Sequence, residues 1–416
     1  MKPKLVLIAF AYPPFTGIGG VRATNMARSL ANVGWKVDVV TPTIQHWGAT
    51  DWKDDSLHPD IRTVRVDGKW SFLGDEANFK QRGLAQKLLS FVFTRYQRNF
   101  RQLESQSVWK SAAIHAIVKQ CADADVVMAT MSPFFTGEIA KVVSEKLKIP
   151  FVLDYRDLVV GNAHEHFLSQ NDRFVAREQE WLDGASLITT VSPSLQQILR
   201  QRIADQKKCR VLWNGYDAEQ FGHYSARATE TGTFRIIYAG TFYPPVRAID
   251  PVFKALSQLD SSDDFSGWQF DYFGSYGSYI SQAAEKYRIA NSVKIHSRIP
   301  RDQALMEMAK SDLIVVITSV RETAELADRG VVTAKLFDSF GVRRPILLIA
   351  PEISDAADVV NKTDSGMTSP GTDIKKIADS IVQIRNQPEF NFQTEAFTWA
   401  SLGGHLDTML RELVDR

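Results

Sequence analysis

The chain has 416 residues, of which 44% are hydrophobic and 23% charged, and its formal net charge is +1. This composition is typical of a globular protein long enough for two domains, and the near-zero charge excludes the basic excess of most nucleic-acid-binding proteins. The two cysteines, Cys121 and Cys209, are too few for a disulfide framework or a cysteine-rich zinc site, which favours a reducing compartment. We therefore expect no nucleic acid among the partners.

The first apolar run of the chain follows two lysines, as in a signal peptide, but it ends at Pro13-Pro14 without a small-residue cleavage pattern. It therefore predicts a first β-strand. The longest apolar runs, at 313–319 and 345–350, are far shorter than a membrane-spanning helix. These features predict a soluble, cytoplasmic protein.

Apolar runs alternate with segments of helical period along the whole chain, which is the pattern of parallel sheets covered by helices on both faces. The first series of predicted strands comprises 4–10, 36–41, 61–66, 125–130, 150–154, 186–191 and 209–213. The second series comprises 234–239, 268–273, 292–296, 312–317 and 345–349. Predicted helices between the strands include 21–33, 107–121, 135–147, 249–259, 301–310 and 372–386.

The two series predict an α/β protein with two doubly wound, Rossmann-like domains. A polar segment at 214–234 has little periodicity and is the expected linker. A stripe of apolar residues at helical spacing predicts a last amphipathic helix; it comprises Trp399, Leu402, Leu406, Met409, Leu410 and Leu413. We therefore place an N-terminal domain at 1–217, a C-terminal domain at 218–390 and a final segment at 391–416, whose helix must pack its apolar stripe on another part of the chain.

Open α/β sheets bind ligands beyond the carboxyl ends of their strands, so the segments that follow strands are the candidates for a site. The first of them, Thr16-Gly17-Ile18-Gly19-Gly20, precedes Arg22 in the first turn of a predicted helix. Glycines allow a ligand to approach the backbone, and a helix N-terminus offers free N–H groups to an anion. The alternative is a plain turn between strand and helix.

A second charged segment, DYRDL at 154–158, follows a predicted buried strand. Its charges must either pair with one another, as Asp154–Arg156 or Arg156–Asp157, or contact a ligand, for which Asp157 is the best candidate. The nearby sequence HEH contains His164 and His166, but two histidines without a third ligand are weak evidence for a metal site. The motif DAD at 123–125 lies at the start of a strand, where an aspartate commonly caps a helix, so we expect no metal.

The C-terminal half repeats this design. After the strand at 234–239, a loop with two prolines sets Arg247 at the start of the next helix, where an arginine can hold a phosphate through two hydrogen bonds. A short helix predicted at Val331–Phe340 places Lys335 and Asp338 on one face. These two residues either form a surface ion pair or bind a ligand. In the second case Lys335 contacts a phosphate and Asp338 contacts sugar hydroxyls. The cations that follow several other strands favour this second interpretation.

The motifs occur in an ordered series along nearly the whole chain: YPPFTGIGGVR, LANVGWKVDVVT, DYRDL, VSPSL, VLWNGYD, YAGTFYP and AKLFDSFGVRRPIL. In this order they resemble the retaining, nucleotide-sugar-dependent glycosyltransferases of the GT-B fold, of the family-4 type. The resemblance implies two domains facing across a cleft, with the nucleoside-diphosphate sugar held mainly by the C-terminal half and the acceptor by the N-terminal half. It also implies that the helix of 391–416 packs back on the N-terminal domain. It also implies transfer to a hydroxyl acceptor in surface polysaccharide or glycolipid assembly, without a metal, a cofactor or an enzyme nucleophile.

The same resemblance implies roles for individual residues. Asp338 matches the second carboxylate of the family's paired-glutamate motif, which grips the donor ribose, whereas Gly330 stands where the glutamate that orients the sugar is expected. The family's arginine–lysine pair on the diphosphate maps onto Thr241 and Arg247, and Lys335 replaces the missing cation. The expected site is therefore Arg247, Lys335 and Asp157 for catalysis, Gly19, Gly20, Arg22, Thr241 and Asp338 for the donor, and His164 and Arg156 for the acceptor.

The segment 78–103 contains six lysine and arginine residues and no acidic residue, with leucine, phenylalanine and valine between them. Such a basic amphipathic segment either lies on an anionic membrane or packs its apolar face on the N-terminal domain. By resemblance, relatives that act on lipid-linked acceptors often dock in the first way. The expected partners thus include a sugar or lipid-linked acceptor and, through 78–103, the inner face of a membrane.

Other activities stay open. A nucleotide-sugar 2-epimerase of the same architecture needs acidic and histidine residues for proton abstraction, and Gly330 removes one expected carboxylate. A non-catalytic homologue that binds a nucleotide sugar is suggested by the departures at Thr241 and Gly330. A dinucleotide-dependent oxidoreductase is less favoured, because the first loop lacks the full glycine fingerprint and VDVVT at 37–41 ends without an acidic residue.

Overall fold

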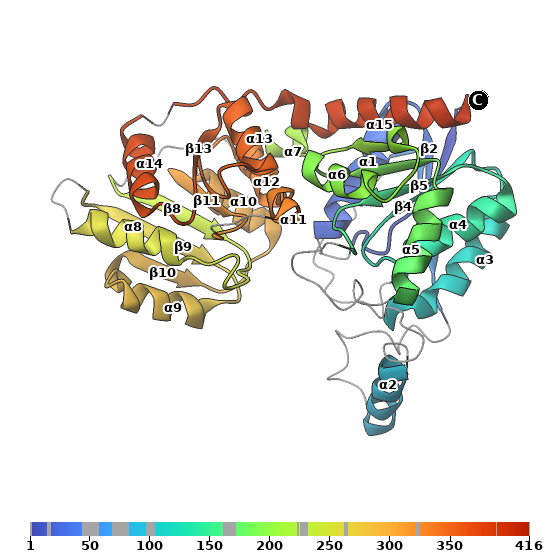
Figure 1. Cartoon of the computed structure of the whole chain (residues 1–416), viewed down its shortest axis with the longest axis horizontal. Helices are drawn as coiled ribbons and strands as arrows, with labels where there is room; N and C mark the ends of the chain where they lie inside the picture. Colours follow the sequence, from blue (N-terminus) through green and yellow to red (C-terminus); the bar gives the residue numbers. More distant parts are fainter. Residues whose placement is uncertain are drawn as a thin grey trace. The chain divides into compact units, whose positions relative to one another are not determined.

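The structure is a computed structural model that describes residues 2–14, 18–43, 58–68, 83–96, 105–160, 172–222, 224, 232–261, 265–321, 325–387 and 389–415. The chain divides into two compact units, one of Met1–Trp213 with Trp399–Arg416 and one of Asn214–Thr398. Each unit is built on its own parallel sheet (Figure 1), which confirms the predicted α/β class with two Rossmann-like sheets. Along the chain, the boundaries between the units lie at 213/214 and 398/399, whereas the sequence analysis places them at 217/218 and 390/391.

The sheet of the first unit has the strand order β3-β2-β1-β4-β5-β6-β7, with all neighbours parallel. Its strands are β1 (Lys4–Ile8), β2 (Lys36–Pro42), β3 (Ile61–Val66), β4 (Val126–Thr130), β5 (Phe151–Tyr155), β6 (Leu187–Thr190) and β7 (Cys209–Val211). Each of them falls on a predicted strand. The strand order reverses direction between β1 and β4, so the segments after these two strands flank a topological switch point.

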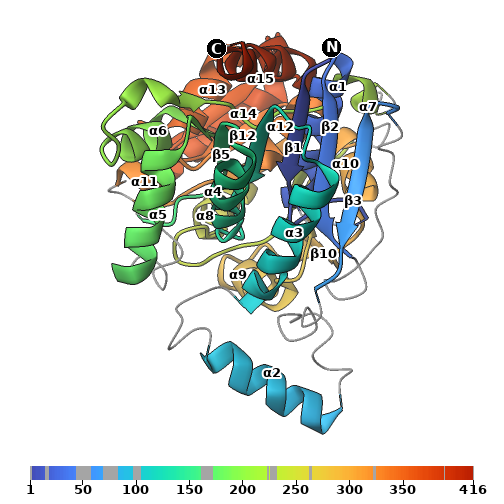
Figure 2. The ribbon, with the colours of Figure 1, turned by 90° about the vertical axis from the view of Figure 1, so that its right-hand side faces the viewer.

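Helices cover both faces of this sheet, as the near-continuous apolar strands require. On one face lie α1 (Ile18–Asn32) and α15 (Trp399–Val414). They pack so closely that a β-carbon added at Gly403 would lie 2.4 Å from the β-carbon of Ser29. On the other face lie α3 (Lys110–Gln120), α4 (Thr136–Leu147), α5 (Asp172–Gly184) and α6 (Pro193–Arg200), of which Figure 2 shows α3 and α4 in front of the strands. The helix α2 (Leu84–Tyr96) and the short 3-10 turns Ser105–Trp109 and Gln206–Lys208 complete the described elements of this unit.

The sheet of the second unit has the order β10-β9-β8-β11-β12-β13, again all parallel. Its strands are β8 (Phe234–Ala239), β9 (Trp268–Phe273), β10 (Val293–His296), β11 (Leu313–Ile317), β12 (Ile346–Ile349) and β13 (Gly366–Ser369). The sequence predicts all of them except β13, whose residues GMTS lack an apolar run. Here the order reverses between β8 and β11, so the segments after these strands flank the switch point of this unit.

The second sheet also has helices on both faces. One face carries α8 (Asp250–Asp260), α9 (Gly277–Lys286) and α14 (Ile374–Asn386), with α8 and α14 side by side in Figure 1. The remaining helices of this unit are α7 (Ala218–Phe221), α10 (Arg301–Ala309), α11 (Leu326–Arg329), α12 (Ala334–Val342) and α13 (Asp355–Thr363), with 3-10 turns at Ala290–Ser292 and Glu395–Phe397. The two ends of this unit run together, because Tyr216 N–H donates to Phe397 O at 3.1 Å.

Candidate active site

The switch point of the second sheet brings together the loop after β8 and the end of β11. Arg247, at the end of the β8 loop, donates from Nε to the carbonyl of Thr318, which follows β11, at 3.3 Å. The same two segments are joined again where Val320 N–H donates to Val246 O at 2.9 Å. The loop closes on itself through a bridge between Tyr243 and Arg247. These contacts hold the half-buried Arg247 guanidinium at the place where open α/β sheets bind ligands.

A glycine at the end of β8 makes room for the side chain of Lys335 from α12. Gly240 has a φ of +139°, and a β-carbon added there would lie 2.3 Å from both Cε and Nζ of Lys335. The Lys335 ammonium donates to the Tyr238 hydroxyl at 3.0 Å and lies 4.3 Å from the centre of the Tyr238 ring. Tyr238 is itself fixed, because its ring stacks on Phe242 at 4.3 Å. The lysine is thus held by an aromatic ring and a hydroxyl rather than by a carboxylate.

The electrostatic environment of Lys335 is strongly unfavourable for its charge. Burial lowers the pKa of Lys335 to about 7, and the positive charge of Arg247 adds to this decrease, while Asp338 opposes it. In the part of the chain that the structure describes, no salt bridge joins Arg247 or Lys335 to a carboxylate. Two neighbouring cations without an acidic partner form a site that a bound anion would stabilise.

Asp338 lies on the same face of α12 as Lys335, as predicted, but the two do not form the surface ion pair that the sequence left open. Asp338 instead accepts a hydrogen bond from Arg301, at the start of α10. The Arg301 guanidinium lies 5.9 Å from the ring of Phe221. The predicted helix Val331–Phe340 in fact begins at Ala334, after the separate short helix α11. Thr241, the other predicted donor residue, is exposed and its carbonyl accepts from the Tyr238 hydroxyl at 3.0 Å.

In the first unit, Arg22 lies in the interior. Its side chain is 3% exposed, and its Nε and Nη2 atoms donate to the two oxygens of Asp154 at 2.9 and 2.6 Å. It also donates to the carbonyls of Trp213 and Leu212 at 2.9 and 3.0 Å, and its guanidinium lies 5.7 Å from the ring of Trp399. Arg22 therefore ties α1 to β5, to the segment after β7 and to α15. We assign it a structural role and leave it out of the donor site proposed below.

The predicted glycine loop also differs from the structure, because α1 begins at Ile18 rather than after the glycines. Gly19 and Gly20 lie in the first turn of the helix, and Arg22 in the second. A β-carbon at Gly19 would lie 2.2 Å from Nη1 of Arg156. Gly19 is therefore the residue that allows Arg156 to reach the amino end of α1.

Arg156 has neither of the ion pairs that the sequence left open. Its Nε and Nη2 atoms donate to the carbonyl of Met131 at 3.0 and 2.9 Å, and Nη2 also donates to the carbonyl of Ser132. Burial lowers the pKa of the Arg156 side chain. Asp157 follows it at the end of β5 and is exposed. His164 lies outside the described residues, so its predicted acceptor contact stays a prediction.

The DAD motif has a structural role. Asp123 pairs with the Lys4 ammonium at 2.6 Å, and Asp125 accepts from the backbone N–H of Lys4 at 2.7 Å. Both aspartates therefore fix the amino end of β1, opposite to the strand ends that bind ligands. Among the described residues, no group of three or more His, Cys, Asp and Glu side chains is placed to hold a metal ion.

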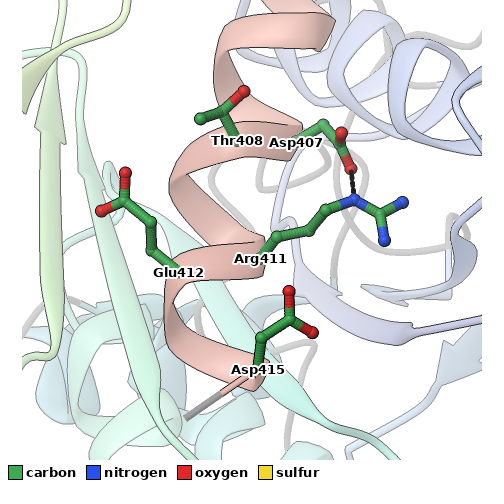
Figure 3. A pocket seen from close by; sticks show the side chains of 5 residues that line it. All are labelled: Asp407, Thr408, Arg411, Glu412 and Asp415. Carbon is green, nitrogen blue, oxygen red and sulfur yellow. Dashed lines mark hydrogen bonds and ion pairs between the residues drawn. The ribbon is translucent and has the colours of Figure 1, made fainter.

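An open hollow of about 500 Å³ lies on α15 and is lined by Asp407, Thr408, Arg411, Glu412 and Asp415 (Figure 3). Asp407 accepts from the Trp35 indole at 2.6 Å and from Arg411 at 2.7 Å, and Glu412 pairs with Arg210. These charges attach α15 to the rest of its unit, so we assign the hollow no ligand. Within the described ranges, no helix has the length and apolar character needed to cross a membrane.

A family model described as "Glycosyl transferase 4-like domain" matches residues 17–215. This part of the chain is therefore similar to a glycosyl transferase 4-like domain, and the chain as a whole has a GT-B fold. This confirms the resemblance seen in the ordered motifs. No curated protein matches the chain significantly in sequence.

Solved structures agree with the GT-B fold over the whole chain. Sucrose-phosphate synthase from Thermosynechococcus elongatus is 15% identical with a TM-score of 0.65, and the match covers 99% of each chain. Anabaena HepE, solved in complex with UDP and glucose, is 13% identical with a TM-score of 0.64 and a coverage of 99% of this chain and 100% of that one. The lipopolysaccharide outer core galactosyltransferase WaaB is 11% identical with a TM-score of 0.60, covering 98% and 99%. At these identities the likeness establishes the fold alone.

Proposed function

We propose that this glycosyltransferase-like protein transfers a sugar from a nucleoside-diphosphate sugar to a hydroxyl acceptor with retention of the anomeric configuration. The observation that carries the proposal is the pair of cations, Arg247 and Lys335, that lie at the switch point of the second sheet without a carboxylate partner among the described residues. A diphosphate supplies the negative charge that these side chains lack. HepE, which shares the fold, binds UDP and glucose in its solved complex.

In the proposed mechanism the acceptor hydroxyl attacks the anomeric carbon on the face from which the diphosphate leaves, and the leaving phosphate takes the hydroxyl proton. Negative charge grows on the diphosphate as the bond breaks, and Arg247 and Lys335 stabilise it. Preorganised donors of this kind typically contribute ~3–4 kcal/mol each. The two side chains supply the charge that the leaving group needs, so the mechanism requires neither a metal ion nor another cofactor.

The remaining residues take the roles that the resemblance implies. Asp338, oriented by Arg301, binds a ribose hydroxyl of the donor, and Thr241 contributes at the diphosphate. Gly19 and Gly20, at the amino end of α1, take the donor-binding role through their backbone N–H groups. Arg156 follows β5 in the same unit as these glycines and, with His164, contacts the acceptor. Asp157, next to Arg156, takes part in catalysis. The galactosyltransferase WaaB acts in the lipopolysaccharide outer core, which supports a surface polysaccharide or glycolipid as the product here.

A lipid-linked acceptor is supported by α2. This helix exposes large apolar side chains, with Leu84 89% and Leu88 66% exposed, whereas its buried position is Ser90 at 2%. Further exposed apolar residues of α2 are Leu89, Phe91, Val92 and Tyr96. Exposed apolar surface of this kind marks a site of association. We propose that α2 lies in the interface of an anionic membrane on the cytoplasmic side.

Charge and length favour a membrane over a second copy of the chain. The segment 78–103 is basic and has no acidic residue, so a symmetric dimer through α2 would bring like charges together. Anionic headgroups instead complement those charges. With 13 residues, α2 is about 20 Å long and cannot cross the hydrocarbon core, so it lies in the plane of the surface.

Vesicle co-sedimentation tests this contact. We expect the protein to bind vesicles that contain phosphatidylglycerol and to bind neutral phosphatidylcholine vesicles weakly, with added salt weakening the first. Replacement of Leu88 and Val92 by serine should abolish binding without loss of the native fold. Equal binding of wild type and variant to anionic vesicles would contradict the role of α2.

Incubation with nucleotide sugars tests the activity and separates it from the alternatives. A thermal-shift panel of nucleoside diphosphates and their sugars identifies the donor, because a specific ligand stabilises the native state. The identified donor is then incubated alone and with an acceptor panel. We expect product only with an acceptor. Conversion of the donor alone would indicate a 2-epimerase of the same architecture, and donor binding without turnover on any acceptor would indicate a non-catalytic binder.

A further inference from the structure

A buried aspartate beyond β11 has no place in the mechanism described so far. Asp328 on α11 is 1% exposed, and its Oδ2 atom accepts from Nη1 of Arg321 at 3.1 Å. Its Oδ1 atom is buried and has no hydrogen-bond partner. Among the described carboxylates of the second unit, Asp328 alone has a buried oxygen without a hydrogen-bond partner. Buried carboxylate oxygens are normally hydrogen-bonded, since leaving one unpaired is costly.

Two hydroxyls on the same stretch of chain are also without partners. Thr318, directly after β11, and Thr333, directly before α12, each have a buried Oγ1 atom that makes no hydrogen bond. Thr318 is also the residue whose carbonyl accepts from Arg247, and Thr333 precedes Lys335 by two positions. The unpaired carboxylate oxygen and the two hydroxyls therefore lie on the segment between Thr318, whose carbonyl contacts Arg247, and Lys335.

The unpaired oxygens of Asp328, Thr318 and Thr333 fit a ligand rich in hydroxyls. A carboxylate oxygen accepts from a hydroxyl, and a threonine hydroxyl either donates to a sugar oxygen or accepts from it. Gly330, two residues after Asp328, has no side chain with which to bind such a ligand. We propose that Asp328 is a specificity-determining residue for the transferred sugar, and that its Oδ1 atom accepts a hydrogen bond from a sugar hydroxyl. This inference rests on the proposed function, since it assigns the sugar end of the same donor.

The Arg321–Asp328 pair also predicts which sugars are rejected. Arg321 donates to Oδ2, whereas Oδ1 of the same carboxylate is buried and its lone pairs are unused. A neutral hexose presents hydroxyl donors to this oxygen. A hexuronic acid would present a carboxylate to it, and two like charges in a buried site repel each other. We therefore expect a preference for neutral sugars over uronic acids.

Binding measurements on the full chain test the assignment. The probes are UDP and GDP and the matching UDP-glucose, UDP-glucuronate and GDP-mannose, and the variant is Asp328→Asn, which keeps the shape of the side chain. We expect this variant to bind the bare nucleoside diphosphate as the wild type does, and to lose about tenfold to a hundredfold of the extra affinity that the neutral sugar provides. UDP-glucuronate should bind the wild type no better than UDP.

The control variant is Asp271→Asn. Asp271 is equally buried in the same unit and pairs with Arg235, so this change also weakens a buried ion pair. We expect it to lower stability and to leave the affinity added by the sugar unchanged. If Asp328→Asn fails to fold, Thr333→Val is measured instead. We expect this variant to lose part of the extra affinity that the sugar provides. An unchanged sugar contribution to the affinity would count against the assignment.

The outcomes distinguish a failure of the Asp328 assignment from a failure of the proposed function. An unchanged ratio of the affinities for nucleotide sugar and nucleotide in Asp328→Asn would overturn the inference, and so would an equal loss of both affinities, which indicates a structural role. In either case the wild type still binds nucleotide, and the proposed function stands. A wild-type protein that binds none of the probes would overturn the proposed function and the inference with it.

Discussion

The ammonium of Lys335 occupies the space that a side chain at residue 240 would fill: a β-carbon on Gly240 would lie 2.3 Å from Nζ. The lysine and the glycine are far apart in the sequence, and they meet because α12 packs beside the end of β8. The consequence is that the position of the cation depends on the absence of a side chain at residue 240.

Replacing this glycine should displace the lysine. We predict that Gly240→Ala lowers kcat by about a hundredfold or more, because the cation leaves the diphosphate, and that it costs about 1–3 kcal/mol of stability through the positive φ. Steady-state kinetics and urea unfolding measure the two effects. Gly232→Ala is the control, since Gly232 has a φ of +65° but nothing within 4 Å of an added β-carbon. Similar kinetics for both variants would argue against the placement of Lys335.

The two cations should each be needed for turnover. We predict that Arg247→Ala and Lys335→Ala each lower kcat by about 10²–10³ while the fold is kept, because each removes one preorganised donor from the leaving diphosphate. Circular dichroism and turnover with the identified donor are the measurements. Lys376→Ala, which removes a partly exposed lysine of α14, serves as the control. Near-normal turnover in both site variants would remove this assignment.

The low pKa of Lys335 predicts a pH dependence of binding. Because burial lowers this pKa to about 7, the ammonium loses its proton as the pH rises through about 7, and the neutral amine attracts a diphosphate less. A bound diphosphate raises the pKa again, so binding takes up a proton above about pH 7. The affinity for UDP or GDP, whichever binds, should therefore fall as the pH rises above about 7.

Calorimetry in buffers of different ionisation enthalpy measures this proton uptake directly. Lys335→Met should bind the nucleotide more weakly and without the uptake. The same number of protons taken up by wild type and variant would show that another group titrates.

Arg22 should affect stability rather than the donor. Arg22→Ala leaves the fully buried Asp154 without its bidentate partner, and breaking a buried pair in this way typically costs about 3–5 kcal/mol. We predict a large loss in the free energy of unfolding, measured with urea. A variant of normal stability that no longer binds the nucleotide sugar would instead support the donor role that the sequence suggested.

Most of the fold could be predicted from the sequence because its signals are local. Buried parallel strands are continuous apolar runs, so 313–317 and 346–349 can be recognised in isolation. The sequence alone does not reveal the strand Gly366–Ser369, because its pairing with β12 rather than its own composition makes it a strand. The sequence pattern predicts too late a start for α1, because glycine is a poor helix former. Gly19 is nevertheless required in the first turn, since Arg156 approaches it too closely for a side chain.

The candidate site could be predicted only in part. Position after a strand identified Arg247, and helical spacing on a short predicted helix identified Lys335. The structure places both beside the switch point of the second sheet. The partners could not be predicted, because they come from distant segments. Asp154 pairs with Arg22 rather than with its neighbour Arg156, and Asp338 pairs with Arg301. Asp328 carried no signal in the sequence at all; only its burial and its unpaired oxygen single it out.

A crystal structure of the protein with UDP or GDP, whichever the binding panel selects, tests the central claim most directly. The account predicts the diphosphate within hydrogen-bonding distance of both the Arg247 guanidinium and the Lys335 ammonium, beyond the carboxyl ends of β8 and β11. A diphosphate bound elsewhere, or one that neither side chain contacts, would contradict it.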